Sequence, residues 1–313
     1  MILTVTPNTT IDLTIIIPSL TPNKTIRAVQ SVYSMGGKPT DASWILGEIG
    51  IPSLALGFTS GATGDRAQTM LRARGVTTDF IPVGGETRIN VVIMTQDNGS
   101  QTTLTTSTMV VEAAHVTALR EKYAASLRGA DCVILGGTLP SGMTPAFYAD
   151  CIALANAHHV PTIFDAADAN LRAGLDARPT FIKPNRDELA TLLGREIQSM
   201  EDAYLAGREI VAQYGTQPIM TFGAEGALAV LRDRAYFIPP LSVPVVSPAG
   251  AGDAMLAGLA ASFARRQPIE EGLKLGTAAA AAVCMLPGTA DCRREDVERL
   301  LPQVELRPFP PKA

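Results

Sequence analysis

The stretch from Pro248 to Gly258 (PAGAGDAMLAG) is the part of the sequence best suited to chemistry. Three small residues, Gly250-Ala251-Gly252, precede an acid and then a run of Ala and Leu that predicts a helix. Small residues let the N–H groups of positions 251 to 253 converge at a helix N-terminus, where the partial positive charge favours an anion. Asp253 would repel a bound phosphate, so its expected role is to take a proton from an incoming hydroxyl during phosphoryl transfer.

An ordinary turn followed by an acid in the first helical turn would have the same sequence, and the residues alone leave both interpretations open. Two common nucleotide motifs are excluded. A dinucleotide fingerprint requires a third glycine at position 255, where Met255 stands. Gly37-Lys38 lacks both the following Ser or Thr of a P-loop and the glycine at position 32. Nucleotide phosphates must therefore be held in another way.

The segment from Lys183 to Glu188 (KPNRDE) is expected to end a strand and begin a helix, the position at which α/β folds bind ligands. Asn185 can cap that helix, and Glu188 three residues later completes an ordinary capping box. The functional alternative is that Asn185 and Glu188 organise a hydrated Mg²⁺ near phosphates, because this hard cation prefers oxygen ligands. Both interpretations fit the residues.

Short apolar runs alternate with segments rich in Ala, Leu and Glu along most of the chain. The runs that predict strands are Asp131–Leu135, Pro161–Phe164, Thr180–Ile182 and Pro218–Phe222. The segments Pro145–His158 and Arg186–Leu193 predict helices. Strands with intervening helices form βαβ units, so we expect an α/β fold with a mostly parallel sheet covered on both faces.

Four β-branched segments lack intervening helices: Thr10–Ile17, Ile26–Tyr33, Arg88–Thr95 and Gln101–Thr106. Asp97-Asn98-Gly99 joins the last two as a hairpin. We expect a small antiparallel sheet, inserted in the α/β body, that closes over a site as a lid. Such a lid would exclude water and protect a reactive phosphoryl donor from hydrolysis.

Composition restricts the setting in which this chemistry occurs. The chain has 313 residues, 46% of them hydrophobic, with a net charge of -4, and we find no clustered basic surface, so nucleic acid is not an expected partner. Its four cysteines form no CxxC pair, which favours a reducing, cytoplasmic compartment. We predict no signal peptide, since the start of the sequence has no basic segment followed by a long apolar stretch. We also predict no membrane anchor, since the long apolar run Leu275–Leu286 is too short to span a bilayer.

Taken together, the motifs resemble the PfkB carbohydrate kinases of the ribokinase superfamily, and within them the 1-phosphofructokinase and tagatose-6-phosphate kinase branch. The likeness rests on GAGD before a small-residue helix, KPNRDEL upstream, Gly-Gly-Lys near residue 36, and GETRINVVI. It extends from Asn8 and Asp12 to the PGTA segment at Pro287–Ala290. These motifs occur in order and at suitable spacing, which is more specific than any one of them.

The resemblance implies a ribokinase-like three-layer sandwich, a single domain over 1–313, with a lid from about 10–34 and 87–107. ATP and Mg²⁺ would be the cofactors, a sugar or sugar phosphate the substrate, and a homodimer could form through the lid. By matching positions, Asp253 would be the base and Gly250, Ala251 and Gly252 the anion hole. Asn185 and Glu188 would position magnesium, and Thr221, Gly223 and Gly226 would contact the nucleotide. The acceptor would meet Asp12, Arg27, Gly36, Gly37, Lys38, Arg88, Asn90 and, in the loop Gly136–Gly142, Thr138.

The chain departs from the branch at several acceptor positions. Pro39 replaces a glycine, and Asp41 replaces an asparagine that normally touches the sugar. An ionised Asp only accepts hydrogen bonds and adds negative charge, which disfavours a phosphorylated acceptor unless a base pairs with it. Val92 stands where lysine is common, and Ser247-Pro248 alters the approach to GAGD.

We expect phosphorylation of a ketose phosphate, of the fructose 1-phosphate, tagatose 6-phosphate or fructose 6-phosphate type, with Arg27 and Arg88 as clamps on its phosphate. The departures keep two alternatives open: a kinase for an unphosphorylated sugar or nucleoside, and a non-catalytic sugar or nucleotide sensor.

Overall fold

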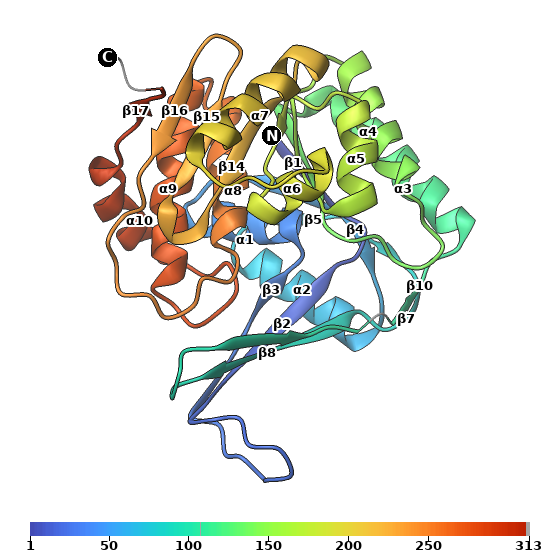
Figure 1. Ribbon diagram of the computed structural model, residues 1–313. Helices are drawn as coiled ribbons and strands as arrows, with labels where there is room; N and C mark the ends of the chain where they lie inside the picture. Colours follow the sequence, from blue (N-terminus) through green and yellow to red (C-terminus); the bar gives the residue numbers. More distant parts are fainter. Residues whose placement is uncertain (107, 311–313) are drawn as a thin grey trace.

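A computed structural model describes residues 1–106 and 108–310, so the last residue of the predicted lid and the end of the predicted domain lie outside it. Its largest sheet follows the order β17-β16-β15-β14-β13-β12-β11-β1-β4-β5, with β6 also paired to β4 (Figure 1). The strands are β1 (Ile2–Thr6), β4 (Ser53–Thr59), β5 (Thr77–Thr78), β6 (Ile81–Pro82), β11 (Cys132–Gly136), β12 (Thr162–Asp165), β13 (Phe181–Ile182), β14 (Gln217–Thr221), β15 (Ala227–Val230), β16 (Ala235–Ile238) and β17 (Arg307–Pro308). Pairing is parallel from β14 through β13, β12, β11 and β1 to β4, β5 and β6, and antiparallel from β14 to β17. The expected mostly parallel sheet is confirmed.

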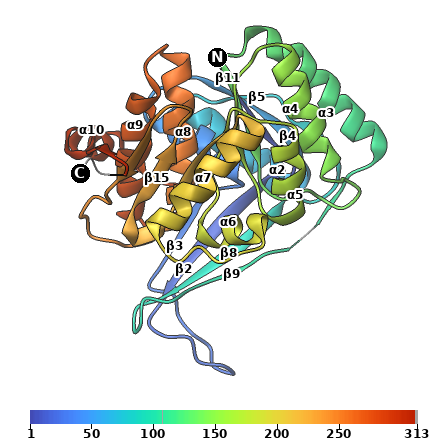
Figure 2. The ribbon, with the colours of Figure 1, turned by 45° about the horizontal axis from the view of Figure 1, so that its top comes forward.

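Helices cover both faces of this sheet, as the two views in Figures 1 and 2 show. They are α1 (Lys38–Glu48), α2 (Gly61–Ala73), α3 (Ala113–Ser126), α4 (Ala146–Ala157), α5 (Asp168–Asp176), α6 (Arg186–Leu193), α7 (Met200–Tyr214), α8 (Ala251–Ala264), α9 (Ile269–Cys284) and α10 (Arg294–Leu300). No helix in the described ranges is both long and apolar enough to cross a membrane.

Alternation along the buried strands separates two cores. Ile2 and Ile134 pack into a cluster with residues of α1, α8, α9 and α10, whereas Leu3 and Leu135 pack into a second cluster with α3 to α7. Successive side chains of a strand point to opposite faces, so a continuously apolar strand contributes side chains to both clusters. The result is the expected three-layer sandwich.

The lid is a separate sheet of order β3-β2-β8-β9, which projects from the body at the bottom of Figure 1. Its strands are β2 (Thr10–Ile17), β3 (Gln30–Gly36), β8 (Arg88–Thr95) and β9 (Gln101–Leu104), and a further small sheet pairs β7 (Gly84–Gly85) with β10 (Met109–Val110). β8 and β9 form the predicted hairpin, but β2 and β8 run parallel. The sheet is therefore mixed rather than antiparallel, because two segments distant in sequence meet at its centre.

Close packing of α8 on α9 fixes the helix that carries Asp253. A Cβ at Gly258 would stand 2.2 Å from Gly276 N and 2.4 Å from Gly272 O. Three glycines thus let the two backbones approach more closely than any side chain would permit. The start of α8 is held in place from the core side.

Candidate active site

Charged side chains gather at the carboxyl ends of the parallel strands. Asp165 ends β12, and Lys183 follows β13. Lys38 Nζ lies 2.7 Å from Asp165 Oδ1, and Lys183 Nζ lies 2.9 Å from Asp165 Oδ2. Burial favours the neutral acid, but the two ammonium groups and their hydrogen bonds outweigh it, so the pKa of Asp165 is lowered. One buried carboxylate therefore joins α1 to two neighbouring strands.

Glu188 and Asn185 form the capping box at the start of α6. Asn185 Oδ1 accepts from Glu188 N–H at 2.8 Å, and Asn185 N–H donates to Glu188 Oε2 at 2.9 Å. Glu188 Oε1 also lies 3.3 Å from Lys38 Nζ, so the cap is part of the charged cluster. The described residues hold no group of three His, Cys, Asp or Glu side chains able to bind a metal by themselves. Magnesium would therefore need phosphate and water oxygens as its main ligands.

Asp253 lies in the first turn of α8 and is 9% exposed. Burial is the largest influence on its pKa, and the charge of Asp165 adds to it. Lys183, Lys38 and a hydrogen bond from Asp41 act in the opposite direction. The pKa of Asp253 is raised to about 7 as a result. A carboxylate tuned to neutral pH is suited to accept a proton from an alcohol.

Asp41 faces Asp253 from the first turn of α1 and is 3% exposed. Burial, and then the charges of Asp253 and Asp12, raise its pKa well above the ordinary value. Asp41 takes part in none of the ion pairs within the described residues. The condition under which an ionised Asp41 would tolerate a phosphorylated acceptor, pairing with a base, is therefore not met among the described residues.

The amides at the start of α8 only partly fit the predicted anion site. Gly250 has φ 80°, and a Cβ there would stand 2.3 Å from Ala290 N, so this position requires glycine. Ala251 N–H donates to Pro248 O at 3.2 Å, and Asp253 N–H to Gly250 O at 3.0 Å. The structure differs here from the expectation of three free amides, because the turn that starts the helix uses two of them. Those two can serve an anion only as shared donors.

Gly252 instead places the helix start beside a lysine. A Cβ at Gly252 would stand 3.2 Å from Lys183 Nζ. The buried ammonium of Lys183 therefore supplements the partial charge of the helix N-terminus. An anion at this point would meet a full positive charge as well as amide dipoles.

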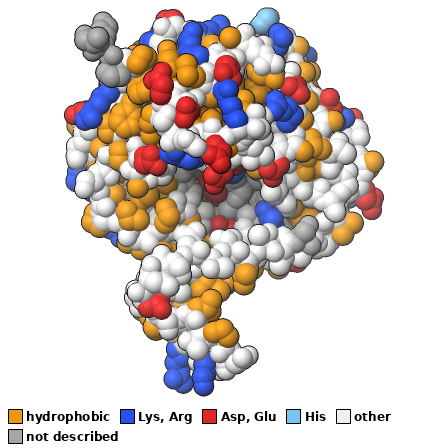
Figure 3. All heavy atoms as spheres, in the orientation of Figure 1, with side chains coloured by type: hydrophobic (Ala, Val, Ile, Leu, Met, Phe, Trp, Pro, Cys, Tyr) orange, Lys and Arg blue, Asp and Glu red, His pale blue; other side chains and the backbone are white. Residues whose placement is uncertain are grey.

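The inner end of the lid meets the loop after β11. Asn90 Nδ2 donates to Asp12 Oδ1 at 2.9 Å, and Arg88 reaches Thr138 Oγ1 at 3.4 Å. Burial raises the pKa of Asp12 despite hydrogen bonds from Thr289 and Asn90 and the charge of Arg88. Four of the predicted acceptor residues thus converge from β2, β8 and the loop. Figure 3 shows the hollow between body and lid, with acidic and basic side chains gathered around it.

The glycines before α1 shape the same end of the lid. A Cβ at Gly36 would stand 2.4 Å from Asp12 Oδ1, so only glycine lets the acid sit against the backbone. Gly37 has φ 93° and leads directly into Lys38. Arg27, by contrast, is exposed between β2 and β3 and forms none of the ion pairs found in the described ranges. The structure does not bring Arg27 to Arg88.

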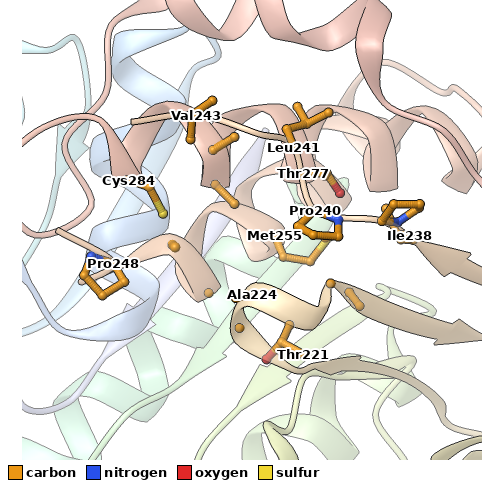
Figure 4. A pocket seen from close by; sticks show the side chains of 18 of the residues that line it. Thr221, Ala224, Ile238, Pro240, Leu241, Val243, Pro248, Met255, Thr277 and Cys284 are labelled. Carbon is orange, nitrogen blue, oxygen red and sulfur yellow. The ribbon is translucent and has the colours of Figure 1, made fainter. Parts of the chain in front are cut away.

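An adjacent cavity of about 630 Å³ opens beside the start of α8 (Figure 4). Its walls are mainly apolar and include Met255 and Leu241. The predicted nucleotide residues Thr221, Gly223 and Gly226 line it. So do Ala251 and Gly252, which were predicted as parts of the anion hole. Asn185 lies next to this wall through a β-bridge to Thr221. The volume of the cavity falls within the range of small-molecule sites, which is roughly 300–1,000 Å³.

Asp165, Lys183 and the Pro-rich cavity wall from Ile238 to Pro248 were not among the residues predicted from the sequence to form the site. Asp165 and Lys183 both directly follow a predicted apolar strand run, where an α/β sheet places functional groups, so that signal was available. The wall has no such signal, because Leu241 and Val243 gain their role only from where the loop folds.

Comparison with known proteins gives consistent matches over the chain. The family described as pfkB family carbohydrate kinase matches residues 4–296. A 1-phosphofructokinase of Escherichia coli strain K12 is 31% identical over 98% of this chain and 98% of that protein. A tagatose-6-phosphate kinase of Staphylococcus epidermidis is 27% identical over 98% and 99%.

Solved structures share the fold at similar levels of identity. Phosphofructokinase-2 from Escherichia coli, in complex with substrates and products, has a TM-score of 0.90 at 25% identity, covering 96% of this chain and 98% of that one. A possible 1-phosphofructokinase from Thermotoga maritima has a TM-score of 0.88 at 25% identity, covering 98% and 99%.

Asp253→Asn should stabilise the protein, and the gain should grow with pH. The folded state holds the Asp253 proton up to about pH 7, whereas the unfolded chain releases it near its ordinary value of 3.8. The native protein therefore loses stability relative to the unfolded chain as pH rises through this window. Thermal unfolding at about pH 5 and about pH 8 measures the effect. Asp150→Asn, at an exposed position, is the control, and an equal shift of Asp253→Asn at both pH values would contradict the assignment.

Proposed function

The chain belongs to the pfkB family of carbohydrate kinases, and from that premise we propose that it transfers the γ-phosphoryl group of ATP to a primary hydroxyl of a ketose phosphate. Relatives named 1-phosphofructokinase and tagatose-6-phosphate kinase support this acceptor class. The observation that carries the proposal is the position of Asp253. Asp253 directly follows Ala251 and Gly252, which line the cavity, and its buried carboxyl is within hydrogen-bonding reach of Asp41.

The nucleotide would enter the cavity beside α8. Its base would lie against apolar side chains such as Leu241 and Met255, and Thr221 offers a hydroxyl. The phosphates would then point to Gly252 and Lys183, where the helix N-terminus and the ammonium attract them. The predicted nucleotide residues Thr221, Gly223 and Gly226 would then all contact the nucleotide from one wall of the cavity.

The acceptor would enter from the lid side. Asp12 and Asn90 are paired and able to bind sugar hydroxyls, and Arg88 offers a guanidinium to a phosphate beside Thr138. Arg27 could assist only if the segment between β2 and β3 moved inward. Gly36 leaves room for the carboxyl group of Asp12 beside the backbone that leads to Lys38.

The reaction needs one proton transfer and one exchange of phosphorus–oxygen bonds. Asp253 takes the hydroxyl proton while the alcohol oxygen bonds to the γ-phosphorus and the bond to the ADP oxygen breaks. Lys183, Lys38 and the start of α8 stabilise charge that spreads over the transferred group. When bound, Mg²⁺ would neutralise the phosphates. We assign Glu188 to hold it through water, with Asn185 fixing Glu188 by the capping box.

Asp253→Asn should lower turnover by about 10²- to 10⁴-fold because the amide cannot accept the proton. ATP binding should change little, since the cavity wall is intact. Steady-state kinetics with a panel of ketose phosphates, together with calorimetric titration of ATP, would measure both. Turnover close to that of the unmodified enzyme would remove Asp253 as the base.

Arg88→Ala should raise the KM for ketose phosphates by about 10- to 100-fold, as expected for loss of a charge-assisted contact. The KM of an unphosphorylated sugar should stay constant, and the exposed control Arg120→Ala should have the kinetics of the unmodified enzyme.

The second candidate function is phosphorylation of an unphosphorylated acceptor. Val92 and Asp41, which are both buried, support it. An Arg88→Ala enzyme with an unchanged KM for every acceptor would favour that candidate.

We further propose that two chains associate through their lids. The lid sheet carries apolar side chains on both faces, and Val29 and Leu104 are 60% and 54% exposed. A tetrameric form of Escherichia coli phosphofructokinase-2 shows that a relative with this fold assembles. A second copy would cover the apolar face that the body leaves open.

Light scattering should therefore give about twice the 32.9 kDa of one chain. Leu104→Glu should shift the protein to the monomer, because a charge in the interface lacks a partner. Leu205→Glu, at a position of matched 50% exposure on α7, should leave the mass unchanged. A monomer at all concentrations would contradict the proposal.

A further inference from the structure

Asp41 is a buried acid with no counter-charge. It is 3% exposed, and its Oδ1 atom has no hydrogen-bond partner within the described part of the chain. Its two acidic neighbours are Asp253 on α8 and Asp12 on β2, and Asp253 is within hydrogen-bonding reach. Water therefore cannot screen a negative charge on a side chain this enclosed.

The cations of the cluster are already engaged. Lys38 and Lys183 contact the two oxygens of Asp165 at 2.7 and 2.9 Å. Lys38 also contacts Glu188 at 3.3 Å, and Arg88 lies by Asp12 at the lid. These are the charged groups that face Asp41 and Asp253 from α1, β12, the end of β13, α6, β8 and β2. None pairs with Asp41.

Two carboxylates in contact and out of water do not both ionise. The N-terminus of α1 offers Asp41 only a partial positive charge, which is weaker than the repulsion from a full charge on Asp253. A proton between the two acids removes that repulsion and adds a strong hydrogen bond.

We propose that Asp41 keeps its proton at neutral pH and donates a hydrogen bond to one oxygen of Asp253, leaving the other oxygen to accept the proton of the acceptor hydroxyl. Asp41 is then a positioning residue that acts through Asp253. This inference rests on the proposed function for its kinetic consequence, although not for the protonation itself. A neutral Asp41 also repels an acceptor phosphate less than a carboxylate would.

A protonated Asp41 should make activity fall at alkaline pH. Above neutral pH, loss of the Asp41 proton would leave two facing carboxylates, and the hydrogen bond that orients Asp253 would disappear. Deprotonation of Lys38 does not explain a fall in activity at alkaline pH. Burial lowers the pKa of Lys38, but the charges of Asp165, Glu188 and Asp253 outweigh burial and raise it. Activity should rise as Asp253 ionises near pH 7 and fall again at higher pH as Asp41 ionises.

The pH dependence of kcat for three proteins tests this: the unmodified enzyme, Asp41→Asn and the exposed control Asp150→Asn. Asparagine donates the same hydrogen bond without titrating, so Asp41→Asn should keep the rise near pH 7 and lose the alkaline fall. Its turnover at neutral pH should stay within about tenfold of the unmodified enzyme, whereas Asp41→Ala should lose on the order of 100-fold. Identical profiles for Asp41→Asn and the unmodified enzyme would overturn the proposal.

Infrared spectroscopy supplies a readout that needs no turnover. At about pH 8, where Asp253 is mostly ionised, the unmodified protein should show the C=O band of a protonated carboxyl group. The band should vanish on alkaline titration and in Asp41→Asn, but persist in Asp150→Asn. Its absence from the unmodified protein would overturn the proposal even if Asp41→Asn failed to fold. An enzyme that shows the band but phosphorylates no acceptor would instead refute the proposed function.

Discussion

The site depends on one constraint: more carboxyl groups than cations gather between the carboxyl edge of the parallel sheet and the inner end of the lid. Asp12, Asp41, Asp165, Glu188 and Asp253 meet Lys38, Lys183 and Arg88. Asp165 holds both lysines and is ionised, which leaves Asp253 and Asp41 without a full counter-charge. The same ion pairs fix the start of α1 against β12 and β13, so electrostatics and geometry have a common origin.

The body and the lid build the two regions to which we assign the nucleotide and the acceptor. The apolar cavity is built by β14 to β16, α8 and α9, whereas the polar hollow is built by β2, β8 and the loop after β11. Close contact of Gly258 with α9 fixes the position of α8, whose start lines the cavity. Burial of Asp253 is unfavourable for stability, and the proposed role of Asp253 as a base gives a reason to retain it, as is common where a site requires an unusual pKa.

Much of this arrangement could be predicted from the sequence, because it follows from local patterns. The βαβ alternation, the strands β2 and β8, the helix α6 and the GAGD turn all follow from periodicity or from small residues. The parallel pairing of β2 with β8 could not, since it joins segments far apart in the chain. The segment Ile26–Tyr33 begins too early, as the strand runs over Gln30–Gly36, where residues pair with β2. Asp41 could be recognised as unusual, but its acidic partner depends on how α1 packs against α8.

A structure with a non-hydrolysable ATP analogue and a ketose phosphate would test the central claim most directly. The account predicts that the attacking hydroxyl oxygen lies about 2.6–3.2 Å from a carboxylate oxygen of Asp253. It also predicts the terminal phosphorus over the start of α8, beside Lys183. A hydroxyl held instead at Asp12, with Asp253 facing only protein, would contradict it.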